Sequence, residues 1–213
     1  MGDLCVNYVI TDANKFRMPY ELPTSTTREK SRELYTFAQA VAAWEMLKGS
    51  PMETAYILAA FGGTRTGKSL AARSGEIKTT QSHGLKFALV PILRRMDDSG
   101  FVPYPDGNLE TLQSIRTAIA PDPFTSRLFE LADEKWLYGG MFPMNKSTLG
   151  DAWDRTAEDK RMPFSNLCNS WRTFAQYEWG IDFDTLEILM SHALPGVTGQ
   201  RYLAPSDEQF LKK

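Results

Sequence analysis

The chain has 213 residues, of which 42% are hydrophobic and 12% aromatic, and this is enough to bury the core of one domain plus an extension. Its formal net charge of −2 excludes a strongly basic nucleic-acid-binding protein, although a local basic face on an acidic chain still binds DNA. The sequence has neither an apolar run of the roughly 18 residues that span a membrane nor a signal-peptide pattern. We therefore expect a cytoplasmic protein that makes no contact with a membrane.

The two cysteines, Cys5 and Cys168, are isolated and far apart in the sequence. Their spacing is typical neither of a disulfide framework nor of a metal site. We expect both thiols to be reduced, and the sequence predicts no metal and no cofactor.

The predicted elements begin after residues 1–34, which show no sustained periodicity and are expected to form an arm or linker. Apolar spacing then predicts helices over Tyr35–Leu47, Met52–Phe61, Phe124–Trp136, Ser147–Lys160, Leu167–Trp179 and Phe183–Ser191, the last one capped by Asp182 or Asp184. Between the second and third helices, a hairpin is predicted from Glu76–Gln81 and Leu85–Ile92, turning at Ser82–Gly84, with Ser114–Ala120 as a third strand. The expected fold class is mainly α with a small antiparallel β-sheet (α+β), in a domain over residues 35–205 followed by a tail at 206–213.

A glycine-rich segment, Gly62–Ser69, matches the phosphate-binding loop of nucleotide-binding proteins at every position of that motif. Such a loop needs a buried strand before it, a helix after it and a second apolar strand that ends in Asp. Tyr56–Phe61 fits a helix as well as a strand, and Phe87–Ile92 contains a proline and is not followed by Asp. A nucleotide-binding protein that uses Lys68 is therefore an alternative function.

The last quarter of the chain gives this segment a second interpretation. Ser165–Gly180, Ile181–His192 and Gly196–Tyr202 resemble the C-terminal boxes of the tyrosine recombinases, or phage integrases, and Ala60–Ile77 resembles their first box. The resemblance covers roughly residues 35–205. It implies the catalytic-domain fold of these DNA breaking and rejoining enzymes, with double-stranded DNA as the partner.

In that family an Arg-His-Arg set, a second His and a Lys hold the scissile phosphate while a tyrosine attacks it. The resemblance puts the first arginine at Arg65, the second His at His192 and the nucleophile at Tyr202. Three further family positions are substituted in this chain. The Lys falls at Glu110, the first His at Ser165 and the second arginine at Cys168.

Other cations are candidates to replace the lost groups. Lys86 or Lys78 is an alternative source of the missing amine, and Arg172 lies one helical turn after Cys168, where its charge partly replaces the lost arginine. The predicted DNA contacts are Lys68, which stands where the family has Glu or Asp, Arg116, in a segment that resembles the family's strand signature, and Arg172. The tail at Asp207–Lys213 is the expected means of homo-oligomerisation.

These substitutions bear on the reaction because fixed cationic donors stabilise the charge that develops on an attacked phosphate, and the loss of one such donor typically costs about 10²–10³ in rate. The sequence therefore predicts a DNA-binding, integrase-like protein of DNA integration and recombination whose cleavage activity is lost or impaired. One alternative is an active recombinase that forms a 3′-phosphotyrosyl link through Tyr202. The alternative from another class is the nucleotide-binding protein.

Overall fold

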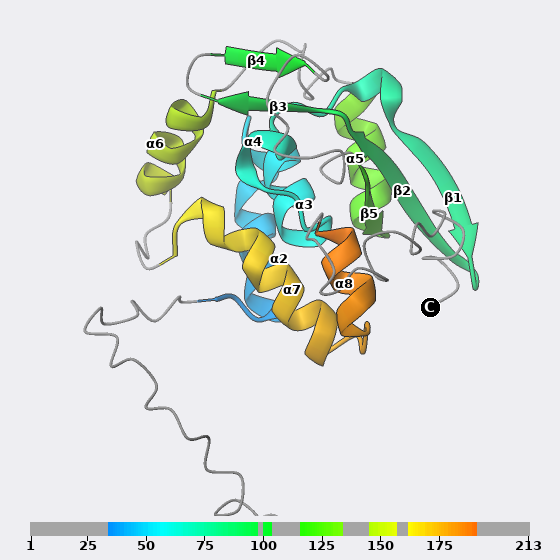
Figure 1. Ribbon diagram of the computed structural model, residues 1–213. Coiled ribbons are helices and arrows are strands. Elements are labelled where there is room, and N and C mark those ends of the chain that lie inside the picture. Colours follow the sequence, from blue (N-terminus) through cyan, green and yellow to red (C-terminus); the bar gives the residue numbers. More distant parts are fainter. Residues whose placement is uncertain (1–33, 98–99, 104–115, 134–144, 157–161, 191–213) are drawn as a thin grey trace, which may run out of the picture. The chain divides into compact units, whose positions relative to one another are not determined.

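A computed structural model describes residues 34–97, 100–103, 116–133, 145–156 and 162–190, coloured along the sequence in Figure 1. Contacts within the chain divide it between Arg32 and Glu33, and the described residues all belong to the second unit. The helices are α2 (Phe37–Leu47), α3 (Glu53–Phe61), α4 (Thr66–Ser69), α5 (Phe124–Asp133), α6 (Lys146–Thr156), α7 (Leu167–Tyr177) and α8 (Phe183–Leu189), with 3-10 turns η1 (Ser74–Glu76) and η3 (Phe164–Asn166). The strands are β1 (Lys78–Ser82), β2 (Leu85–Ile92), β3 (Arg94–Asp97), β4 (Gly100–Pro103) and β5 (Arg116–Pro121).

The mixed α+β class is confirmed, and each of the expected helices is present in the described residues. Helix α8 is capped by Asp182, not Asp184, because Asp182 Oδ1 accepts a hydrogen bond of 3.0 Å from the backbone N–H of Thr185. The described residues include no helix long and apolar enough to cross a membrane. The tail at Asp207–Lys213 lies outside the described residues.

The expected hairpin and third strand form a three-stranded antiparallel sheet in the order β1-β2-β5. The hairpin turns at His83 and Gly84, which both have positive φ. A two-residue turn with this conformation matches the right-handed twist of the two strands that it connects. Pro91 lies on the central strand beyond Leu89, where the pairing with β1 ends, so its missing N–H removes nothing from that ladder. A separate antiparallel hairpin, β3–β4, has no counterpart in the sequence prediction.

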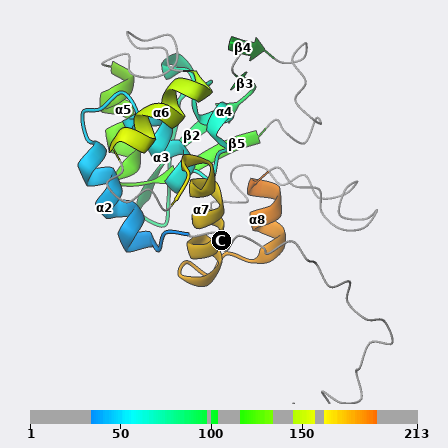
Figure 2. The same ribbon diagram turned by 90° about the vertical axis from the view of Figure 1, so that its left-hand side faces the viewer.

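One face of the three-stranded sheet supplies part of the core. Its buried residues alternate along β2 and β5 as the pleat requires, and they are Ala88, Val90, Ile92, Ala118 and Ala120. Helix α5 packs against β2 and β5, and α3 packs against β5 (Figure 2). The small alanine side chains let both helices approach the sheet closely.

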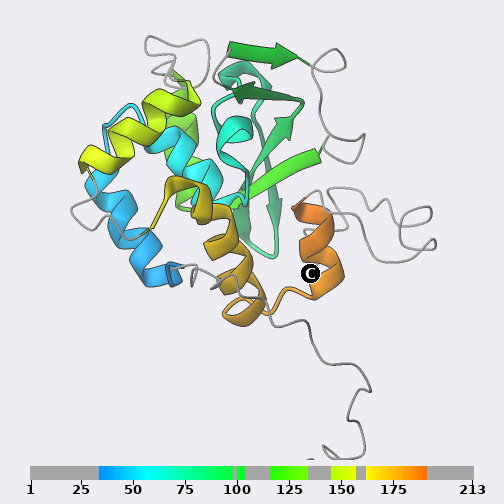
Figure 3. The same cartoon turned by 60° about the vertical axis from the view of Figure 1, so that its left-hand side comes forward.

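Helix α3 is the centre of the described domain, and all of its residues are buried. It contacts α2, α5, α7 and β5, and α7 runs beside it with α8 next to α7 (Figure 3). Aromatic contacts tie it to its neighbours: Phe61 stacks on Phe124 with ring centroids 3.6 Å apart, and Tyr56 stacks on Trp153 at 5.8 Å. A helix that is apolar on all sides is stable only when it is surrounded in this way.

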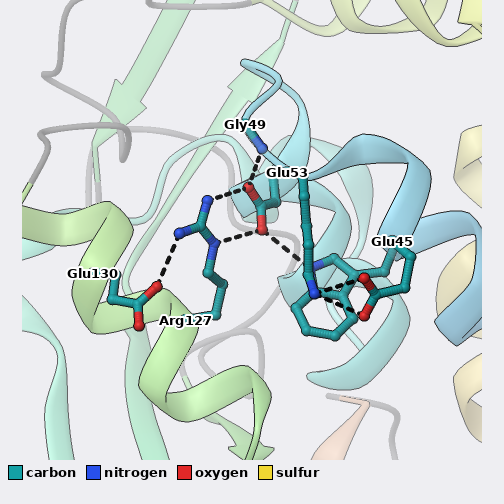
Figure 4. A network of polar contacts seen from close by, with 7 residues as sticks. Glu45, Gly49, Glu53, Arg127 and Glu130 are labelled. Atoms are coloured by element: carbon teal, nitrogen blue, oxygen red, sulfur yellow. Dashed lines mark hydrogen bonds and ion pairs between the residues drawn. The ribbon is translucent and has the colours of Figure 1, made fainter.

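The first residue of α3, Glu53, is a fully buried carboxylate with four hydrogen-bond donors (Figure 4). Arg127 of α5 donates from Nε at 2.8 Å and from Nη2 at 2.9 Å. The backbone N–H of Gly49 donates at 2.8 Å, and the indole of Trp44 in α2 donates at 3.1 Å. The cluster joins α2, α3 and α5, and the start of α3 favours the negative charge.

Burial by itself would raise the pKa of Glu53, because it penalises the charged form. The hydrogen bonds from Arg127, Gly49 and Trp44, together with the Arg127 charge, outweigh burial, so the pKa lies below its ordinary value of 4.5. A carboxyl whose pKa is lowered by folding stabilises the fold above its unfolded pKa, and this stability is lost as the pH falls through the folded value.

We expect Glu53→Gln to lower the free energy of unfolding at pH 7 by about 3 kcal/mol, because it leaves Arg127 without its buried counter-charge. The deficit should shrink as the pH falls below the ordinary carboxyl pKa of 4.5 and through the lowered pKa of folded Glu53, where the wild-type side chain itself becomes protonated. Urea denaturation across this pH range measures both effects. The control is Glu45→Gln, which removes an exposed pair with Lys48 and should cost less than about 0.5 kcal/mol. Equal losses in the two variants would contradict this account of the cluster.

Candidate functional site

The site is built on the turn that ends α3. Gly62 and Thr64 both donate their backbone N–H groups to the carbonyl of Leu58, at 3.2 and 3.1 Å. Gly63 between them has φ of 63°, the left-handed conformation that glycine adopts at helix ends. A Cβ at Gly63 would lie 2.5 Å from the ring of Trp171 in α7. The glycine therefore lets α7 pack directly against the backbone of this turn.

Arg65 follows this turn and is exposed. It precedes the short helix α4, and its carbonyl accepts from the backbone N–H groups of Lys68 and Ser69 at 2.9 and 3.0 Å. The hydroxyls of Thr64 and Ser69 share a further hydrogen bond of 2.5 Å. These contacts fix the backbone of Arg65 at the edge of the core.

Arg116 enters the same region from the sheet. It begins β5 and alternates with Ala118 and Ala120, so it belongs to the core face of the strand. Its Nη2 donates to the carbonyl of Gly63 at 2.9 Å, but its buried Nε and Nη1 have no hydrogen-bond partner among the described residues. Burial lowers the pKa of Arg116 to about 10, and the charge of Arg65 acts in the same direction. The guanidinium is therefore charged at neutral pH.

Cys168, near the start of α7, completes the group. Its buried Sγ donates to the carbonyl of Ser165 at 3.4 Å. Burial raises the pKa of this thiol, although the charges of Arg65 and Arg116 act against that shift. The thiol is thus neutral at physiological pH. We call Arg65, Arg116 and Cys168, with the carbonyl of Gly63, the arginine cluster.

The arginine cluster joins two positions that the resemblance places at one phosphate. Arg65 and Cys168, which the resemblance assigns to the family's two arginine positions, come from distant segments, and the charge of Arg65 acts to lower the pKa of the Cys168 thiol. Ser165 is exposed in η3, the turn before α7. Three predicted site residues lie outside the described residues, namely Glu110, His192 and Tyr202.

Arg172 has a partner of its own. Its Nη2 lies 2.5 Å from Oε1 of Glu187 in α8, and its guanidinium lies over the ring of Phe183, 5.4 Å from the centroid. The interpretation that Arg172 replaces the charge lost at Cys168 thus gains no support, because this cation is paired across α7 and α8. Sequence spacing within one helix gives no information about a partner in the next.

The lysine candidates lie in three different settings. Lys68 is buried within α4, which is unusual for a lysine expected to contact DNA at the surface. Lys78 is exposed at the start of β1. The ammonium of Lys86 lies over the ring of Phe129 in α5, 5.8 Å from its centroid.

The phosphate-loop interpretation lacks its structural context. The element before Gly62 is the helix α3, where a nucleotide-binding loop needs a strand, and the helix after it, α4, has only four residues. Gly67 packs against β3, since a Cβ there would overlap the Met96 carbonyl. The glycines of this motif thus serve the close packing of α7 and β3. Among the described residues, no group of three or more His, Cys, Asp or Glu could hold a metal ion.

Comparisons with protein-family models, curated proteins and solved structures find no match to this chain. The tyrosine-recombinase resemblance therefore stays a prediction that rests on the residues quoted above. The sequence pointed to Arg116 as a DNA contact but not as a partner of Arg65. The position of Arg116 in the sequence could have shown that it faces the core, because it alternates with the small apolar residues Ala118 and Ala120.

Gly63→Ala should lower the free energy of unfolding by about 2–4 kcal/mol, from the left-handed backbone and from overlap with Trp171. The matched control is Gly49→Ala, which also has positive φ (77°) but open space around a Cβ, and it should cost only about 1 kcal/mol. Chemical denaturation of both variants measures the difference. Equal losses would mean that α7 does not pack against this turn.

Proposed function

We propose that this chain is a double-stranded DNA-binding protein of the tyrosine-recombinase type, acting in the cytoplasm in DNA integration and recombination, with cleavage lost or impaired. The observation that carries the proposal is the packing of the turn before Arg65 against α7, the helix of Cys168, because a Cβ at Gly63 would overlap Trp171. The charge of Arg65 also acts on the Cys168 thiol, whose pKa it lowers. The resemblance assigns these residues to the two arginines that hold one phosphate. Phosphate-loop chemistry, the competing function, lacks the strand it requires.

Impaired cleavage follows from the chemistry of the substituted positions. Cys168 supplies a neutral thiol where the family has a guanidinium, and Ser165 supplies a hydroxyl where it has an imidazole. Neither group stabilises a developing negative charge as a fixed cation does, and each such loss typically costs about 10²–10³ in rate. Losses of this kind need not multiply independently.

DNA binding requires fewer precisely placed groups than cleavage does, because contacts to the phosphates require only cations at the surface. Arg65 is exposed and its backbone is fixed by α4, so it is a cation at the surface that a duplex could contact. Binding carried by such contacts weakens steeply with salt, since each neutralised phosphate releases counterions.

A second candidate is an active recombinase that uses Tyr202. One observation favours it, since the arginine cluster still contains two guanidiniums, those of Arg65 and Arg116. Formation of a covalent protein–DNA adduct separates this candidate from the proposed one.

We expect the protein to bind duplex DNA in a salt-sensitive way and Arg65→Ala to bind it more weakly. The slope of log K against log salt should be shallower in this variant by about 0.9, the value expected for the loss of one phosphate contact. The control is Lys48→Ala, which removes an exposed charge paired with Glu45 and should leave the slope unchanged. Fluorescence anisotropy at several salt concentrations gives both slopes. Duplex binding that is absent, or that does not respond to salt, would overturn the proposal.

On suicide duplexes that carry a nick or a bridging phosphorothiolate, we expect no covalent adduct, or only a trace, on a denaturing gel. Any adduct should disappear in Tyr202→Phe. A strong adduct with this dependence would replace the proposed function by the second candidate.

A further inference from the structure

Arg116 presents an energetic problem that the fold alone does not solve. Its guanidinium makes one hydrogen bond, to the Gly63 carbonyl, while Nε and Nη1 are buried without partners among the described residues. Buried polar groups are normally hydrogen-bonded, and a buried charge without a counter-charge is costly. The neighbouring charge of Arg65 adds repulsion.

The unpaired N–H groups of Arg116 are costly when nothing accepts from them, and they become favourable when they donate to a bound anion. Two guanidiniums that repel each other both gain from a shared oxyanion, and unpaired N–H groups donate to its oxygens. Arginine is the side chain best suited to phosphate because its planar fork of donors stays charged. The unmatched donors of Arg116 thus point to a ligand rather than to a purely structural role.

We propose that Arg116 supplies the second guanidinium of a phosphate site whose first is Arg65, so that the cationic group lost from α7 at Cys168 is replaced from the strand β5. The geometry supports this relocation, since Arg116 comes from the sheet and is oriented by the Gly63 carbonyl. Because the Cys168 thiol is neutral at physiological pH, α7 adds no further positive charge near Arg116. The identification of the ligand as a phosphodiester of DNA rests on the proposed function, whereas the phosphate site itself does not.

The first test uses Arg116→Met, an apolar replacement of similar length, with inorganic phosphate as the probe. Thermal unfolding is followed with increasing phosphate at constant ionic strength, with chloride as the balancing anion. Phosphate should stabilise the wild type by mass action. Arg116→Met and Arg65→Ala should weaken this phosphate affinity at least about tenfold, as expected for a lost charge-assisted hydrogen bond. The control Lys48→Ala should behave as the wild type.

A structural role for Arg116 predicts the opposite effect on the phosphate-free protein. If Arg116 only ties β5 to Gly63, Arg116→Met removes a useful hydrogen bond and lowers the melting temperature without phosphate. If Arg116 is an unpaired donor kept for a ligand, the apolar variant melts at the same or a higher temperature, because it removes a buried unmatched charge. A lower melting temperature together with unchanged phosphate affinity would overturn the proposal.

A swap of the two side chains tests the relocation directly. Cys168→Arg alone puts a third guanidinium against the other two, so it should lower stability and should not tighten phosphate binding. The double variant Arg116→Cys with Cys168→Arg returns the charge to α7 and should bind phosphate more tightly than Arg116→Cys alone. If Cys168→Arg alone tightens binding, then residue 168 is an empty position and Arg116 has not replaced it.

Duplex DNA as a second probe separates this inference from the proposed function. Salt-sensitive DNA binding that weakens in Arg65→Ala but is unchanged in Arg116→Met would leave the proposed function intact and overturn the role of Arg116. Phosphate binding that requires Arg116, without any duplex binding, would support the site and overturn the proposed function.

Discussion

The close approach of α7 to the turn after α3 is the constraint on which the rest of the site depends. Trp171 rests against the backbone of Gly63, and only a glycine leaves room for it. This contact holds α7, the helix of Cys168, against the turn that precedes Arg65. It also leaves the Gly63 carbonyl directed at Arg116 of β5. One turn conformation therefore brings together three segments that are far apart in the sequence.

The buried charged groups of Glu53 and Arg116 differ in how many of their hydrogen bonds are made within the protein. The carboxylate of Glu53 is matched by donors from Arg127, Trp44 and Gly49, so its charge ties three helices together. The guanidinium of Arg116 has one acceptor and a like charge nearby. A fully matched buried charge is typical of a structural role, whereas an under-matched one indicates a site that is completed by something else.

Local patterns in the sequence predicted the local elements well. Apolar spacing predicted α2, α3 and α5–α8 but not the short helix α4, and the turn at His83–Gly84 predicted the central hairpin. Partnerships across the chain were not predictable, because a side chain's neighbours depend on packing rather than on spacing. The pairing of Arg172 with Glu187, and of Glu53 with Arg127, belongs to this class. The hairpin β3–β4 has short strands, too brief for a clear two-residue alternation.

The structural role of the segment Gly62–Ser69 depends on the element that precedes it. After a strand, its glycines would free backbone N–H groups to hold a nucleotide phosphate; after the helix α3 they admit Trp171 and β3 instead. The exposed cation of this segment is then Arg65, which follows a turn that contacts both α7 and Arg116. The neutral thiol and the buried strand arginine suit each other, because an arginine at residue 168 would add a third positive charge to this cluster. Under the proposed function, the cysteine in α7 and the arginine in β5 therefore belong to one rearrangement of the phosphate site.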